Sequence, residues 1–194
     1  MPKIVDHQER RRAITGAACE VIAADGLRAV TMRDIAERAG CTTGMVVYYF
    51  QSKEAVLLAA LTSVSQAVAD RMVALADDPE ADLAMLLRET LPMDERRLLE
   101  WRVWIAFWDT AAHDPALAAE QRNRYRSWSE ALQLILRTTG HASGPHLVEA
   151  AEIIMTIVDG IGLQAVFDPD RWPPDRQETQ MRRQVAHVLA DLTL

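Results

Sequence analysis

Cysteine is scarce in this sequence: the 194 residues include only Cys19 and Cys41. Two cysteines cannot form the disulfide framework of a small secreted domain, and they do not form the CxxC pair typical of metal sites. We interpret both as structural residues, with Cys19 on a buried helix face and Cys41 in a turn.

Long apolar runs are also missing. No uninterrupted run reaches the roughly 18–20 residues that span a bilayer. Residues 1–6 lack the apolar core of a signal peptide. The sequence therefore predicts a cytoplasmic location.

Signatures of catalysis and of cofactor binding are absent. The sequence has no P-loop, dinucleotide fingerprint, nucleophile elbow or metal-binding helix motif. Asp109 and His113 lie four residues apart, but a solvated pair or a helix-end interaction explains them more simply than a metal. His141 and His146 lie in a loop without ligand spacing. We predict no enzyme activity, no cofactor and no metal.

A strongly basic charge is lacking too, since the net charge is −7. Residues 1–54 nevertheless hold eight basic and seven acidic residues, a net charge of +1, whereas the remainder holds 13 basic and 21 acidic residues, a net of −8. Nucleic-acid contact is therefore expected only at the N-terminal end, because the remainder repels phosphate.

Alternation typical of strands is not found, and glycine and proline number only eight each. Apolar residues instead recur at steps of three and four, which predicts an all-α protein. The expected helices cover residues 7–24, 32–39, 43–50, 53–77, 81–90, 94–112, 115–139, 145–167 and 174–192.

The sharpest local pattern lies between Thr31 and Phe50. Thr31 is typical of an N-cap, Asp34 completes a capping box, and Gly40 is a typical C-terminal stop. A bracing helix, a short turn and residues 43–50 then match a helix-turn-helix, whose second helix enters the major groove of DNA. The alternative is a helix pair used for packing or for protein contact.

The second helix needs one packed face and one DNA-contacting face. We assign Val46, Tyr49 and Phe50 to the packed face. The predicted DNA-contacting residues are Thr31, Arg33, Thr42, Thr43, Gly44, Met45, Val47, Tyr48 and Lys53. Hydroxyls and helix-start amides suit phosphate oxygens or base edges. The helix itself offers no Arg, Asn or Gln for bidentate base contacts, which favours thymine-methyl contacts and shape readout.

These residues resemble the signature of the TetR/AcrR family of repressors. The resemblance rests on TMRDIAERAG at residues 31–40 and YYFQSKE at residues 48–54, and it covers roughly residues 8–60. It implies about nine helices, with a three-helix DNA-binding domain at residues 1–54 and a ligand-binding and dimerisation domain at residues 55–194. Thr43 and Val47 stand where the family often has Lys and Tyr, so the operator sequence does not follow.

The C-terminal part is similar to the BetI-like branch of that family. The similarity rests on WIAFW at residues 104–108, HDPAL at residues 113–117 and VDG at residues 158–160. BetI responds to choline, but motifs this short do not transfer a ligand.

Aromatic residues form a stripe in the same part of the chain. Core packing explains it most simply. The alternative is a ligand pocket lined by Trp101, Trp104, Trp108, Asp109, Tyr125 and Trp128. The ligand of such a pocket would be either a neutral or anionic apolar molecule, or a cation caged by the rings with Asp109 or Glu100 as counter-charge.

The last two helices carry wide apolar stripes that predict a dimer interface. The residues concerned are Ile154, Met155, Val158, Ile161, Val185, Val188 and Leu189, while the final helix extends the stripe to Leu192. Burial within one chain is the alternative. The sequence thus predicts a dimeric repressor that binds a palindromic double-stranded operator and is released by a small-molecule inducer. The other hypothesis is a ligand-independent or protein-regulated DNA-binding regulator.

Overall fold

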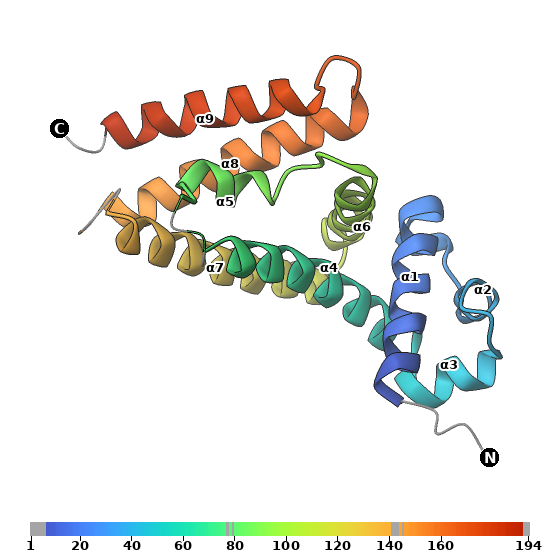
Figure 1. The fold of residues 1–194 in the computed structure, drawn as a ribbon. Coiled ribbons are helices and arrows are strands. Elements are labelled where there is room, and N and C mark those ends of the chain that lie inside the picture. Colours follow the sequence, from blue (N-terminus) through green and yellow to red (C-terminus); the bar gives the residue numbers. More distant parts are fainter. Residues whose placement is uncertain (1–6, 77, 79, 141–143, 145, 192–194) are drawn as a thin grey trace. The chain divides into compact units, whose positions relative to one another are not determined.

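The computed structural model describes residues 7–76, 78, 80–140, 144 and 146–191. Within these ranges the secondary structure is helical, as expected from the sequence (Figure 1). The helices are α1 (His7–Ala29), α2 (Met32–Arg38), α3 (Thr43–Phe50), α4 (Lys53–Ala76), α5 (Leu83–Arg88), α6 (Glu95–Ala111), α7 (Pro115–Thr138), α8 (His146–Phe167) and α9 (Pro174–Asp191).

The chain forms two compact units. The first comprises residues 1–67 and 102–110, and the second comprises residues 68–101 and 111–194. The chain passes from the first unit to the second within α4, and α6 is likewise divided between them. The domain boundary at residue 54 stays a prediction.

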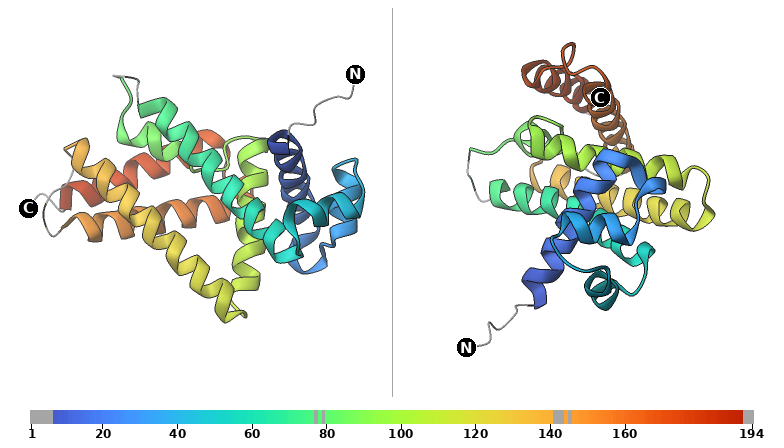
Figure 2. Two further views of the ribbon diagram at one scale, coloured as in Figure 1. Left: turned by 90° about the horizontal axis from the view of Figure 1, so that it is seen from below. Right: turned by 90° about the vertical axis from the view of Figure 1, so that its right-hand side faces the viewer.

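In the first unit, α2 packs against both α1 and α3 (Figures 1 and 2). Fully buried side chains from successive helices, including Ile14, Ile35 and Val46, form its core. The buried Cys19 points its thiol at the carbonyl oxygen of Ala60 on α4. α1 departs from helical geometry at Gly26, whose φ of 76° suits only a residue without a Cβ. Cys41 lies in the turn before α3 and is partly exposed.

In the second unit, α8 packs between α7 and α9, and α5 packs against α9. Figures 1 and 2 both show α8 and α9 side by side. The buried face of α8 runs from Leu147 to Ala165 and supplies much of the core.

Two described helices, α4 and α8, are apolar and long enough to cross a membrane by composition alone. The sequence analysis overlooked them because charged residues interrupt both. Each has a buried stripe, with Val56, Ala60 and Val64 on α4 and Ile154 and Val158 on α8. Core helices of a folded soluble domain show the same composition.

Candidate DNA-binding surface and effector unit

The helix-turn-helix is fixed by local hydrogen bonds at three helix ends. The Thr31 hydroxyl accepts from the Asp34 amide at 3.2 Å, and the Asp34 carboxylate accepts from the Thr31 amide at 2.9 Å, which confirms the capping box. Gly40 adopts a left-handed φ of 60°, and the amides of Gly40 and Cys41 donate to the carbonyls of Glu37 and Ala36. This Schellman ending turns the chain sharply into α3.

The start of α3 is capped by Thr42. Its hydroxyl accepts from the Met45 amide at 3.2 Å. The amides of Thr43 and Gly44 precede the first intrahelical donor, so they are available to an oxygen ligand. Both residues are exposed.

The two faces of α3 differ in exposure. Val46 and Phe50 are buried, whereas Val47 is 44% exposed and Tyr48 is 71% exposed. Tyr49, assigned to the packed face, and Met45, assigned to the DNA face, are both half-buried. The Tyr48 ring meets the Tyr49 ring edge to face, with centroids 5.2 Å apart, but both Val47 and Tyr48 present most of their exposed surface outside the core.

The predicted phosphate ligands lie around this helix. Thr31 and Arg33 are exposed at the start of α2, although the Thr31 hydroxyl is occupied by the Asp34 carboxylate at 2.6 Å. Lys53, at the start of α4, donates to the carbonyl oxygen of Arg28 at 3.4 Å. Lys53 therefore also closes the end of α1. DNA contact by these residues stays a prediction.

The start of α1 braces α3 through contacts that the sequence analysis missed. His7 Nδ1 lies 3.0 Å from the Tyr49 hydroxyl, and Arg11 donates to the Tyr49 carbonyl oxygen at 3.2 Å. The Arg11 guanidinium also lies 4.5 Å from the centroid of the Phe50 ring. The run of arginines at residues 10–12 indicated a possible contact, but the partners of Arg11 lie about 40 residues away, so the sequence does not identify them. These contacts fix the direction of α3.

In the second unit, Trp101 is a core residue. It is 1% exposed, and its indole N–H donates to the carbonyl oxygen of Thr90 at 2.8 Å. Its ring packs directly over Gly162, where an added Cβ would overlap the indole. Gly162 thus permits close helix packing, whereas a Cβ on Gly160 would meet open space.

Trp104 and Trp108 are half-buried and belong to the first unit, as does Asp109. The Asp109 side chain is 66% exposed and lies 3.9 Å from Arg28. A cation-binding carboxylate needs partial burial, because water screens an exposed one. This exposure does not favour Asp109 as a counter-charge in a pocket, and that role stays a prediction.

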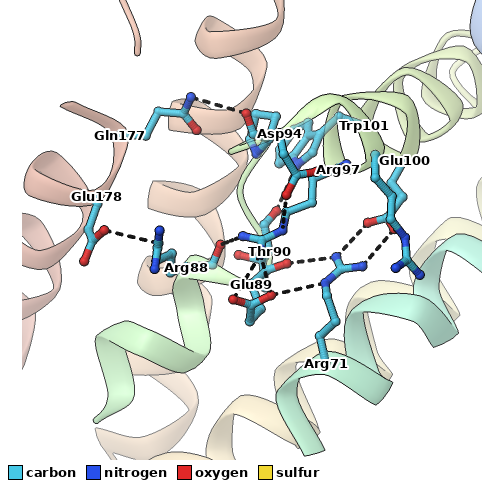
Figure 3. A network of polar contacts seen from close by, with 12 residues as sticks. Arg71, Arg88, Glu89, Thr90, Asp94, Arg97, Glu100, Trp101, Gln177 and Glu178 are labelled. Atoms are coloured by element: carbon cyan, nitrogen blue, oxygen red, sulfur yellow. Dashed lines mark hydrogen bonds and ion pairs between the residues drawn. The ribbon is translucent and has the colours of Figure 1, made fainter. Parts of the chain in front are cut away.

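Glu100, the other proposed counter-charge, already takes part in a network of ion pairs within the fold (Figure 3). Its carboxylate accepts two hydrogen bonds from the Arg71 guanidinium, at 2.8 and 2.7 Å, and lies 3.7 Å from Arg96. Glu89 approaches Arg71 at 3.2 Å and Arg97 at 2.9 Å. The hydrogen bonds that Arg71 donates to Glu100 raise the pKa of Arg71. Glu100 is therefore already neutralised within the fold.

A different carboxylate in this unit carries no basic partner among the described residues. Tyr125 on α7 donates its hydroxyl to Asp159 on α8 at 3.2 Å. Burial raises the pKa of Asp159 to about 6, although the hydrogen bond from Tyr125 acts in the opposite direction. Burial and the neighbouring Asp159 charge raise the pKa of Tyr125 to about 12. The sequence analysis named Tyr125 but missed Asp159, which it read only as part of a short motif. Trp128 lies three residues after Tyr125 and is half-buried.

The predicted dimer residues lie mostly inside the protomer. Ile154, Met155, Val158, Ile161 and Val185 are buried, while Val188 and Leu189 are half-buried. Packing of α8 between α7 and α9 accounts for this burial within one chain. Leu192 lies outside the described residues.

The opposite face of α8 is exposed and partly apolar. It presents the exposed residues Ile153, Thr156, Leu163 and Phe167 and the half-buried Gly160, with Phe167 72% exposed. These positions alternate at steps of three and four, the spacing of a helix–helix seam. We call this set the α8 seam.

Metal binding finds no geometric support in the described part of the chain, where no group of three or more His, Cys, Asp or Glu residues is arranged to hold an ion. Asp109 and His113 are both exposed near the end of α6. His146 begins α8, and His141 lies outside the described residues.

A capped three-helix unit with an exposed recognition helix, joined to a larger helical unit, defines a helix-turn-helix transcriptional regulator. Comparison with known proteins gives the family. Residues 14–60 match the model of the bacterial regulatory proteins of the tetR family, and residues 79–190 match the C-terminal model of the BetI-type transcriptional repressors. The chain belongs to the TetR family, in its BetI-type branch, and is a transcriptional regulator rather than an enzyme.

Individual relatives agree with this assignment. The chain is 29% identical to the regulator PksA of Bacillus subtilis, over 100% of this chain and 96% of PksA. It is 30% identical to BetI of Pseudomonas aeruginosa, over 90% of each protein.

Solved structures of similar fold include a transcriptional regulator from Rhodococcus sp. Rha1, with a TM-score of 0.81, 26% identity and coverage of 95% of this chain and 98% of that one. Another is a regulator from Saccharomonospora viridis in complex with choline, with a TM-score of 0.79, 26% identity and coverage of 93% and 97%.

Proposed function

We propose that this protein is a homodimeric repressor that binds a palindromic operator and is released by a small molecule. The observation that carries the proposal is the recognition helix. Thr43, Val47 and Tyr48 project from a helix whose other face is locked into the core. Both ends of the turn before it are fixed by caps. DNA is the partner that this geometry fits.

The test is an electrophoretic mobility shift with DNA from the protein's own promoter region. Wild type should give a sharp shift that fades at higher salt, because phosphate contacts release counterions. A Thr43→Glu/Tyr48→Ala variant should lose the shift, since a carboxylate would face phosphate and an exposed contact would be removed. Asp170→Asn, an exposed change in the second unit, serves as the control and should bind as wild type does. If the variant binds equally well, α3 is not the recognition helix.

Dimerisation is proposed on the α8 seam. Two recognition helices must lie about one helical turn of DNA apart, roughly 34 Å, to read a palindrome, which requires two chains. The seam supplies an exposed apolar surface that one protomer leaves uncovered. On α9 the exposed positions Thr179, Arg183, Ala186 and Ala190 recur at similar spacing and include two small side chains.

Sedimentation analysis tests this interface. Phe167→Asp should convert dimers to monomers, because it places a charge in the seam. Leu134→Asp is the matched control, since Leu134 is 58% exposed on α7 and lies off the seam. A dimer that survives Phe167→Asp and dissociates with Leu134→Asp would place the interface elsewhere.

Release by a small molecule is supported by the similar regulator that was solved with choline. Ligand would favour a conformation whose recognition helices no longer match two half-sites. The alternative is a regulator controlled by a protein or by its own abundance. This alternative would be favoured if no small molecule weakens operator binding in the mobility-shift assay. Acting on DNA, the protein would work in the cytoplasm.

A further inference from the structure

Tyr49 of α3 is held at two points by the start of α1, at its backbone and at the tip of its side chain. Arg11 donates to the Tyr49 carbonyl oxygen at 3.2 Å, and His7 Nδ1 forms a hydrogen bond of 3.0 Å with the Tyr49 hydroxyl. The His7 and Tyr49 rings also lie against each other, with centroids 5.9 Å apart. Because a helix of eight residues has little rigidity of its own, these contacts from another helix fix the place of the Tyr49 ring.

Tyr49 in turn supports the exposed ring of Tyr48. The two rings meet edge to face, with their planes at 88°. Consecutive side chains on a helix point about 100° apart and do not ordinarily face each other, so the backbone of α3 does not impose this contact. The contact gives a defined direction to the Tyr48 ring, which is 71% exposed and which the core does not hold.

Stability of the fold does not explain this chain of contacts. The hydrogen bond between His7 and Tyr49 is exposed to solvent, so its net contribution to the free energy of unfolding is small. Its effect falls instead on the order of the Tyr48 side chain before DNA arrives. A side chain that is already ordered loses less conformational freedom on binding, and ordering one flexible side chain at an interface costs roughly two- to tenfold in affinity.

We propose that His7 and Tyr49 are positioning residues that hold the Tyr48 ring in the orientation in which it meets the operator. The proposal rests on the proposed operator binding and adds residues that set its specificity. Non-specific DNA is held mainly through its phosphates, and such binding does not need an oriented ring. His7 therefore raises the affinity for the operator relative to other DNA, rather than the affinity for DNA in general.

Fluorescence anisotropy of the full-length protein, over a range of salt concentrations, tests this role. The two probes are the promoter fragment that wild type shifts most strongly and a scrambled duplex of the same length. His7→Ala should weaken binding to the promoter fragment by about three- to tenfold, leave the scrambled duplex unchanged and keep the slope of log K against log salt. His7→Asn places an amide atom where Nδ1 lies and should restore most of the loss. Ala13→Ser, an exposed change on α1, is the matched control and should bind as wild type does.

Action through Tyr48 is tested in a Tyr48→Ala background, at low salt so that binding stays measurable. There His7→Ala should have no further effect, because the ring that it positions is gone. Thermal unfolding should show each variant within about 2 °C of wild type, which separates positioning from loss of the fold. The proposal is wrong if His7→Ala binds the promoter fragment as wild type does, if it weakens both duplexes equally, or if its full effect persists without Tyr48. A salt slope reduced by about one would make His7 a phosphate ligand and would also overturn the proposal.

A measurement without DNA separates failure of this proposal from failure of the proposed function. The sequence has three tyrosines, so a protein with ring-labelled tyrosine gives a simple NMR spectrum that single Tyr→Phe substitutions assign. The Tyr48 ring protons should show a ring-current shift from Tyr49, and His7→Ala should reduce it. That result in a protein that binds no operator would uphold the positioning and overturn the repressor. Operator binding by a protein whose Tyr48 signals do not respond to His7→Ala would uphold the DNA-binding function and overturn the positioning.

Discussion

Gly162 offers a sharp test of the packing, because a single methyl group there should reverse its usual effect. Gly162 lies inside α8, and replacing a helical glycine with alanine ordinarily stabilises a helix by about 1 kcal/mol. Here the new Cβ would overlap three atoms of the Trp101 ring, Cζ2, Cη2 and Cε2. We therefore expect Gly162→Ala to destabilise the protein.

The magnitude follows from the fact that Trp101 cannot move freely. The ring is 1% exposed, and its N–H is bound to the Thr90 carbonyl. Overpacking a core costs about 1–3 kcal/mol, and breaking a buried hydrogen bond costs about 1–3 kcal/mol more. After the gain in helix propensity, the free energy of unfolding should fall by about 3 kcal/mol. For a chain of this length that corresponds to a melting temperature lower by roughly 6–12 °C.

Urea and thermal unfolding, followed by circular dichroism, measure this change. Gly16→Ala is the control, since Gly16 is an exposed position within α1 where a Cβ meets no atom within 4 Å. That variant should be as stable as wild type or up to about 1 kcal/mol more stable. The Trp101→Phe background adds a double-mutant cycle, in which a smaller ring should reduce the cost of Gly162→Ala.

The reasoning fails if Gly162→Ala is as stable as wild type, or if Trp101→Phe leaves its cost unchanged. Either result would mean that α8 does not approach the indole as closely as described.

Three further predictions follow from charged side chains. Asp159 has a folded pKa of about 6, above its ordinary 3.8, so the folded state binds more protons between these values and wild type loses stability as pH rises from 4 to 6. Urea unfolding should show Asp159→Asn more stable than wild type above pH 6, by about 1–2 kcal/mol after allowance for partial exposure. This difference in the free energy of unfolding should disappear by pH 4. A difference that stays constant with pH would contradict the raised pKa of Asp159. In the same assay, Glu100→Gln should lower the free energy of unfolding by about 2 kcal/mol, because the Arg71 charge loses its main partner. Glu20→Gln, at an exposed ion pair, is the control and should change stability by less than about 0.5 kcal/mol. Equal effects of the two substitutions would refute a special role for the network. Arg33→Ala should weaken binding to all DNA sequences alike and reduce the salt dependence of log K by about one, measured by fluorescence anisotropy; an unchanged slope would remove Arg33 from the phosphate contacts.

The sequence by itself determined the helices and the turn between α2 and α3. Their signals are local: Thr31 and Asp34 form a capping box within one turn, and Gly40 takes a backbone conformation that other residues resist. Because these interactions span three to five residues, they can be read without knowing the fold. The exposed and buried sides of α3 followed for the same reason, except at Tyr49 and Met45, where neighbouring helices leave each side chain half-buried.

Only the tertiary structure decided which apolar face of α8 packs inside the protomer and which acidic side chain lacks a basic partner. The stripe of α8 with Ile154 and Val158 is as apolar as any interface, yet it packs against α7 and α9, which leaves Phe167 outside. Glu100 and Asp159 are both acidic residues on helices, but one meets Arg71 from α4 and the other meets Tyr125 from α7. Such pairings join residues 29 and 34 positions apart, and no local pattern encodes them. They arise from how the helices pack, since burial and charge pairing are properties of neighbours in space.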